Sequence, residues 1–241
     1  MNTFLPLDLI ILFILITGIG IGIKRGVIKS AVMFFGTIIV LILSFLLKNP
    51  VAHILYSIFP FIELSGKYQG LTTLNILIFN AIAFIAVYLV LIGILQIIIK
   101  ISGFLEKILD YTIILAIPSK ILGGIFGLLE NYLIVFVIMF IIVQIPNTYE
   151  FTSKSMIGNY ILSSTPILSK TSKEYYDSAK EILSIVDTNN NGKTEEEINN
   201  NNKVALDIML KHHITNVEEI NYLVKIGKLK VKNINEVINK Y

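Results

Sequence analysis

Glu130 is an acidic residue inside a long apolar stretch, where a carboxyl group has the chemistry of a proton relay or a substrate gate. It is the tenth residue of a predicted 25-residue span, which at about 1.5 Å per residue places it near the middle of a bilayer. The alternative, which we favour, is a protonated carboxyl that donates a hydrogen bond to another helix. Asn80 and Gln96 are the expected partners, because no lysine or arginine is predicted at that depth.

Asp8 is also an acidic residue within an apolar stretch, two residues after Pro6. A helix N-terminus favours negative charge, so we expect Asp8 to cap its helix at the membrane surface. The amide side chains of Asn75, Asn80 and Gln96 are expected to form hydrogen bonds between helices rather than to line a pathway.

The local motifs of common enzymes are missing from the sequence. It has no cysteine and none of the patterns HExxH, GxSxG, GxxxxGK[ST] or GxGxxG. His53 is alone in a predicted outer loop, and the adjacent His212 and His213 do not share one helical face, which argues against a joint metal site. We therefore expect a protein that is not an enzyme.

A polar segment near the C-terminus matches the first half of a calcium-binding EF-hand loop. Oxygen-bearing side chains occupy its positions 1, 3, 5 and 9: Asp187, Asn189, Asn191 and Glu195. Gly192 stands at the turn position, but Ile198 stands where the bidentate carboxylate is required. The segment is either a calcium site without its strongest ligand or a disordered polar loop, and we expect no other cofactor.

The elements that must position these residues are membrane helices. The chain has 241 residues, of which 54% are hydrophobic and 15% are charged, far more apolar than a soluble domain. Four apolar blocks are long enough to cross a bilayer: residues 5–23, 27–47, 74–99 and 121–145. We therefore predict an all-α membrane protein whose transmembrane domain covers residues 1–146.

The segment before the fourth span is predicted to lie on the membrane surface. Apolar residues recur at helical spacing over residues 101–117, with charged residues on the other side. A re-entrant segment at residues 111–117 is the alternative.

Basic residues in the predicted loops are unequally divided between the two sides of the membrane. One side has six: Lys24, Arg25, Lys29, Lys100, Lys107 and Lys120. The other side has three: Lys48, Lys67 and Lys154. Because lysine and arginine are retained in the cytoplasm, both termini are predicted to be outside the cytoplasmic membrane.

The C-terminal part of the chain is polar and is predicted to be exposed to water. Residues 147–172 are expected to form a linker with a possible surface helix, and residues 173–241 a small helical region. Thr215 with Glu218, and Asn233 with Glu236, have the spacing of capping boxes. Gly227 fits the end of a helix.

Glycines recur every fourth residue in two of the predicted spans. They are Gly18, Gly22 and Gly26 at the first span, and Gly123 and Gly127 at the fourth. Such rows let two helix backbones approach closely, so they suggest one packed helix pair.

These features resemble the colicin V production protein family of bacterial inner-membrane proteins. The resemblance covers about residues 5–168 and is carried by Asp8, the glycine-rich turn with Lys24 and Arg25, the stretch from Leu122 to Leu129, and the exit segment with Ser153, Ser155, Tyr160 and Pro166. The sequence departs from the family's pattern at Glu130 and Asn131, where a basic and a small residue are usual. The resemblance implies four membrane helices and an association with peptide-toxin production or export and with envelope maintenance.

We therefore expect a non-enzymatic membrane protein that acts in export or envelope maintenance. Its expected partners are the lipid bilayer, other membrane or export proteins, or further copies of itself; the net charge of +3 gives no argument for nucleic acid. One alternative is an oligomeric channel or proton-coupled carrier that uses Glu130. Another is a membrane anchor for an extracytoplasmic binding module.

Overall fold

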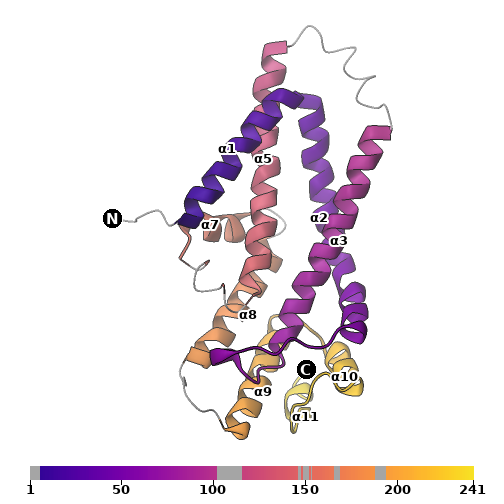
Figure 1. Ribbon diagram of the computed structural model, residues 1–241, viewed down its shortest axis with the longest axis vertical. Helices are drawn as coiled ribbons and strands as arrows, with labels where there is room; N and C mark the ends of the chain where they lie inside the picture. Colours follow the sequence, from indigo (N-terminus) through magenta and orange to yellow (C-terminus); the bar gives the residue numbers. More distant parts are fainter. Residues whose placement is uncertain are drawn as a thin grey trace. The chain divides into compact units, whose positions relative to one another are not determined.

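In the computed structural model of the protein, the described residues are 6–101, 116–145, 148, 152, 154–165, 169–187 and 194–241. They form helices and turns, and these residues contain no strand. In chain order the elements are α1 (Pro6–Arg25), α2 (Val27–Ile58), the 3-10 helix η1 (Gly66–Tyr68), α3 (Leu74–Ile101), α5 (Ala116–Val143), α7 (Met156–Ser164), α8 (Ser169–Asp187), α9 (Glu195–Lys211), α10 (Val217–Lys225) and α11 (Asn235–Ile238) (Figure 1).

Four of these helices, α1, α2, α3 and α5, are long and apolar enough to cross a membrane. Their exposed surface carries leucine, isoleucine and phenylalanine side chains such as Leu9, Phe13 and Ile97, as expected of helices that face lipid. The prediction of an all-α membrane protein with four membrane helices is confirmed. The predicted interfacial helix at residues 101–117 lies almost wholly outside the described residues.

The prediction that the second helix ends at residue 47 is wrong. α2 continues through Pro50 to Ile58, although proline removes one backbone hydrogen bond from a helix. In this extension Ala52 and Tyr56 are completely buried. Tertiary packing therefore stabilises helix where the local sequence indicates a break.

The chain divides into two compact units. Unit 1 contains Met1–Lys48, Phe84–Met139 and Thr152–Thr165, and unit 2 contains Asn49–Ala83, Phe140–Phe151 and Pro166–Tyr241. α1, α7 and most of α5 belong to unit 1, whereas α8 to α11 belong to unit 2. Each unit has its own core and is described separately.

Unit 2 joins the C-terminal helices to the segment between α2 and α3. Asn202 of α9 accepts hydrogen bonds from the backbone N–H and the hydroxyl of Thr73, at 3.1 and 2.9 Å, and donates one to the Gly70 carbonyl, at 2.9 Å. Tyr56 donates a hydrogen bond of 2.8 Å to Glu219 of α10, and Glu219 is only 3% exposed. The C-terminal region is therefore packed against residues 49–83 rather than separate from them.

The apolar stripe of α8 forms part of the same core. Tyr175, Ala179 and Ile182 are buried and recur at helical spacing along α8. Tyr175 packs edge-on against Phe140, and its burial raises the pKa of the phenol. The segment predicted as a linker contains α7 and the start of α8.

Helix ends in unit 2 differ in detail from the sequence prediction. α9 has a capping box of Thr194 and Glu197 that was not predicted. α10 is capped by Asn216, which accepts a hydrogen bond from the Glu219 N–H, so the predicted pair of Thr215 and Glu218 is one residue out of register.

The predicted cap at Asn233 is wrong as well, because α11 begins after Ile234 and has no side-chain cap. Glu236, its predicted capping partner, forms an ion pair with Lys203 of α9 instead. The prediction that Gly227 ends a helix is confirmed. It follows α10 with a φ of +70°, which glycine adopts easily.

Candidate functional site

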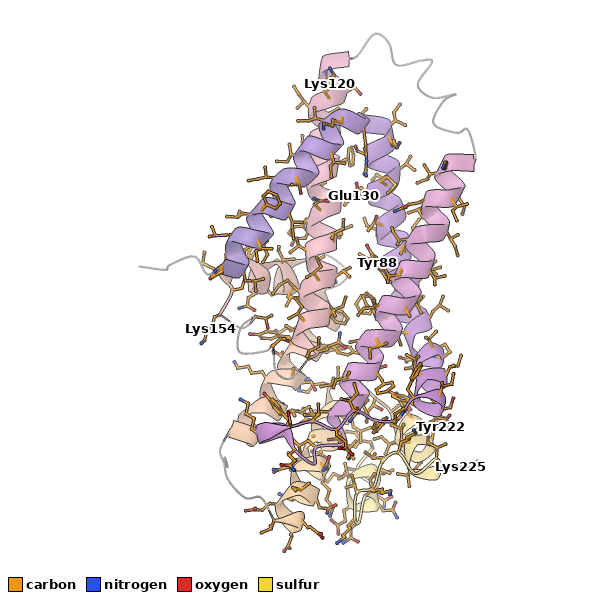
Figure 2. The ribbon with its side chains drawn as sticks, in the orientation of Figure 1. Tyr88, Lys120, Glu130, Lys154, Tyr222 and Lys225 are labelled. Atoms are coloured by element: carbon orange, nitrogen blue, oxygen red, sulfur yellow. The ribbon has the colours of Figure 1, made fainter. Side chains whose placement is uncertain are left out.

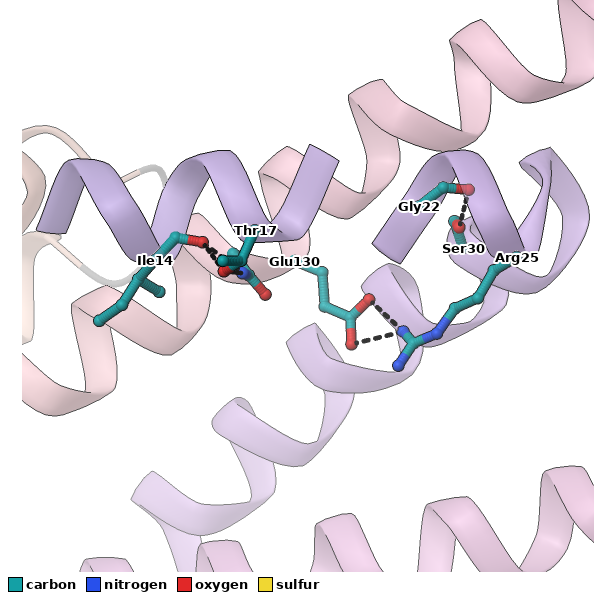
Figure 3. Close-up of polar contacts among 7 residues, drawn as sticks. Ile14, Thr17, Gly22, Arg25, Ser30 and Glu130 are labelled. Atoms are coloured by element: carbon teal, nitrogen blue, oxygen red, sulfur yellow. Dashed lines mark hydrogen bonds and ion pairs between the residues drawn. The ribbon is translucent and has the colours of Figure 1, made fainter. Parts of the chain in front are cut away.

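Glu130 forms an ion pair with Arg25 inside the group of membrane helices (Figure 3). One guanidinium nitrogen of Arg25 donates to both carboxylate oxygens, at 2.9 and 3.2 Å. The Glu130 side chain is 9% exposed and the Arg25 side chain is 31% exposed. The expected partners Asn80 and Gln96 are therefore wrong, and so is the expectation that no basic group reaches this carboxyl.

The two side chains meet because of the register between α1 and α5. The end of α1 lies beside the start of α5, where the Ser119 hydroxyl accepts a hydrogen bond of 3.3 Å from the Val27 N–H. Glu130 is about three turns further along α5, but helical side chains tilt toward the N-terminus of their helix, which here is the end that carries Arg25. The long side chains of Arg25 and Glu130 therefore meet, and the predicted boundaries of the spans do not indicate this contact.

The ion pair gives the site a defined chemistry. Arginine keeps its charge in proteins, so it neutralises the Glu130 carboxylate without a proton. Tyr88 of α3 is close enough to Glu130 to interact with its charge (Figure 2). The pair fastens α1 to α5.

Glycines bring the backbones of α1 and α5 together beside the pair. A Cβ atom added at Gly18 would lie 2.5 Å from the Gly127 carbonyl oxygen, and one added at Gly22 would overlap with the Gly123 carbonyl. Gly20, on the same helix, has open space around it. The glycine rows of the sequence therefore meet each other, and only glycine fits at these contacts.

Gly26 forms the turn between α1 and α2. Its φ of +76° lies in the region that side chains disfavour. Ser30, one turn further on, donates a hydrogen bond of 3.4 Å to the Gly22 carbonyl. The turn therefore holds Arg25 at the end of α1.

Asn131, next to Glu130, also joins α5 to α1. Its amide donates a hydrogen bond of 2.6 Å to the Ile14 carbonyl, which the Thr17 hydroxyl also contacts at 2.7 Å (Figure 3). Both residues at which the sequence departs from the family's pattern therefore contact the same helix.

Asp8 contacts the start of α7. Its carboxylate accepts hydrogen bonds of 2.6 Å from the Ser155 hydroxyl and 3.1 Å from the Ile157 N–H, and Asp8 is 2% exposed. Asp8 therefore caps a different helix, whose Ser155 lies 147 residues away in the chain, and the expected capping of its own helix stays a prediction.

The predicted polar residues of α3 lie in different surroundings. Asn80 is 1% exposed and its amide has no hydrogen-bond partner among the described residues, so the expected inter-helix bond is wrong. Gln96 is exposed on the helix surface. Asn75 bonds to the backbone of Ile62 and Thr72 and thereby orders the segment that leads into α3.

The histidines have structural neighbours. His53 lies in α2, not in a loop as predicted, and stacks on Tyr222 with ring centroids 4.9 Å apart. His212 contacts Glu181 at 3.1 Å, and this hydrogen bond lowers the pKa of the Glu181 carboxyl. No group of three or more potential metal ligands occurs among the side chains that the structure describes.

The calcium-loop prediction falls mostly outside the described part of the chain. The side chains of Asp187, Asn189 and Asn191 are not described, whereas Glu195 is exposed at the start of α9. The calcium site therefore stays a prediction.

Sequence reasoning missed Arg25 and Ser155 as partners of the buried carboxylates. In the sequence, Arg25 serves as a topological signal and as part of the family pattern, and Ser155 only as part of that pattern. A buried carboxylate requires a hydrogen-bond donor from a neighbouring element. The polar residues at the ends of the neighbouring helices are the signal in the sequence that indicates such donors.

Comparisons with known proteins agree with the membrane architecture. Residues 7–166 match the family described as colicin V production protein. An uncharacterized transmembrane protein of Bacillus subtilis (strain 168), YshB, is 30% identical over 176 residues, which cover 70% of this chain and 97% of the relative. No solved structure matches the chain. The chain is a membrane protein that belongs to the colicin V production protein family.

Proposed function

We propose that the protein is a non-enzymatic scaffold component of the bacterial cytoplasmic membrane that acts in peptide-toxin export or envelope maintenance. The family supports the general role. The observation that carries the proposal is the Arg25–Glu130 ion pair. The two oppositely charged side chains bind each other and hold α1 and α5 together. Such a helix pair provides a fixed surface for partner proteins.

The experiment is crosslinking and copurification of the full chain from intact membranes. Wild type is compared with Gly22→Val, which disturbs the α1–α5 contact, and with Gly20→Val, which adds the same side chain in open space. We expect wild type and Gly20→Val to recover the same membrane partners and to support peptide-toxin export equally. Recovery of the chain alone in all three samples would refute the scaffold proposal.

Both termini are proposed to be outside the cytoplasm, on the basis of the lysine and arginine distribution. A reporter enzyme that is active only in the cytoplasm should therefore be inactive when fused after Tyr241. Activity of that fusion would invert the orientation without affecting the scaffold role.

A proton-coupled carrier is the second candidate, because Glu130 is a carboxyl group among membrane helices. It requires Glu130 to release Arg25 during a transport cycle. Proton or solute flux in reconstituted vesicles that is abolished by Glu130→Gln would favour the carrier. Absence of flux together with recovery of partners favours the scaffold.

A further inference from the structure

α7 has an exposed apolar face opposite its buried face. Gly158, Ile161 and Leu162 are buried, whereas Met156 is 53% exposed and Tyr160, one turn later, is 66% exposed. With nine residues the helix is too short to cross a membrane. Its surroundings therefore have to be inferred from its depth relative to the membrane spans.

The first marker of depth is Asp8. α1 has 20 residues and is therefore about 30 Å long, which equals the thickness of the hydrocarbon core. Asp8 is the third residue of α1, so its backbone lies about 3 Å inside the start of the span. Because Asp8 binds Ser155 and Ile157, α7 begins at the membrane boundary.

The second marker is Met139 of α5. The contacts between α1 and α5 follow a regular antiparallel register, in which Gly22 meets Gly123, Gly18 meets Gly127 and Ile14 meets Asn131. Extending this register by two more turns places Met139 level with Pro6. Met139 touches Gly158 of α7. The register of α5 therefore also places α7 at the membrane boundary.

The ends of α7 are satisfied by side chains. Ser155 caps its start by accepting a hydrogen bond from the Gly158 N–H, and the Thr165 hydroxyl donates to the Ile161 carbonyl at its end. Figure 1 shows α7 running across the direction of α5 beside the start of α1. A helix with satisfied ends that lies along the membrane plane is suited to the boundary between headgroups and acyl chains.

We propose that the exposed face of α7 is a lipid-binding surface in the headgroup region of the outer leaflet. α1, which α7 contacts through Asp8, itself exposes apolar side chains: Leu9 is 59% exposed and Phe13 is 68% exposed. Met156 and Tyr160 both lie at the boundary between headgroups and acyl chains, where aromatic side chains concentrate. Lys154 is exposed just before α7 (Figure 2), and in this arrangement its ammonium group meets the lipid phosphates.

The absence of tryptophan from the chain allows a direct test. Tyr160→Trp is reconstituted in phosphatidylcholine–phosphatidylglycerol vesicles that contain lipid brominated near either the headgroup or the methyl end of the acyl chain. Phe13→Trp, in the middle of α1, is the control for the hydrocarbon core. Tyr241→Trp, at a C-terminal residue that is 56% exposed, is the control outside α7.

We expect the shallow brominated lipid to quench Tyr160→Trp more strongly than the deep one, with the reverse order for Phe13→Trp. Met156→Trp gives the same order and keeps the test open if Tyr160→Trp does not fold. An indole in α7 that neither lipid quenches, and that emits like tryptophan in water, overturns the proposal. Quenching that is absent while the site crosslinks to a second copy overturns it as well, in favour of a protein interface.

Discussion

At the scale of single residues, the two buried carboxylates of α1 and α5 have partners that the linear sequence separates widely. Arg25 and Glu130 are 105 residues apart in the chain and form one ion pair. Asp8 and Ser155 are 147 residues apart and share a hydrogen bond. In both cases a carboxylate with little solvent contact receives hydrogen-bond donors from another element, as a buried polar group requires.

Replacing both members of the ion pair should destabilise the protein by less than the sum of the two single replacements. Arg25→Gln leaves the buried Glu130 carboxyl without its charged donor, which costs about 1–3 kcal/mol. Glu130→Gln should cost less, because Arg25 is partly exposed and its side chain can turn toward the headgroups. Thermal unfolding in one detergent should show the double variant losing less than the sum of the single losses; strictly additive losses would contradict the pair.

At the scale of helices, backbone proximity requires residues without side chains at defined positions. Gly22 and Gly20 are two residues apart in α1, yet only Gly22 lies against α5. The sequence predicts a glycine-packed pair from the spacing of four residues. The three-dimensional contacts show which glycines take part in it.

Gly22→Val should lower stability by about 1–3 kcal/mol or more, because the added carbons force the two backbones apart. Gly20→Val should be nearly neutral in the same thermal unfolding assay, since its surroundings are open. Equal effects of the two substitutions would mean that α1 does not contact α5 through this face.

The cap of α10 offers a test of register at the same scale. Asn216→Ala should cost about 1 kcal/mol, because it removes the acceptor for the Glu219 N–H. Glu218→Gln, at the position that the sequence indicated, should leave stability unchanged. Hydrogen exchange of the first turn of α10 measures both, and faster exchange in Glu218→Gln alone would restore the sequence-based register.

At the scale of the whole molecule, the C-terminal region is part of a unit that includes membrane-proximal residues. Asn202 and Glu219 both bond to residues between 49 and 83. These buried polar contacts do not favour an independent binding module on a passive anchor. They make the order of residues 70–73 depend on the C-terminal helices.

Asn202→Leu should therefore loosen both partners of the contact. It leaves the buried N–H of Thr73 without an acceptor, at a cost of about 1–3 kcal/mol. Hydrogen exchange should increase in residues 70–73 and in α9, while Asn200→Leu, at an exposed position of the same helix, should have little effect. Unchanged exchange in Asn202→Leu would show that this contact does not hold the C-terminal region.

The sequence by itself determined which segments are membrane helices. The length and hydropathy of the apolar blocks fix four membrane helices, and glycine spacing predicts which helix faces allow close approach, because both properties act within one helix. The tertiary structure decided the partner of each polar group: Arg25 for Glu130, the start of α7 for Asp8, and the segment before α3 for Asn202. It also carried α2 past Pro50, since burial of Tyr56 depends on residues distant in the chain. Pairing and burial are relations between elements, and spacing along one element does not contain them.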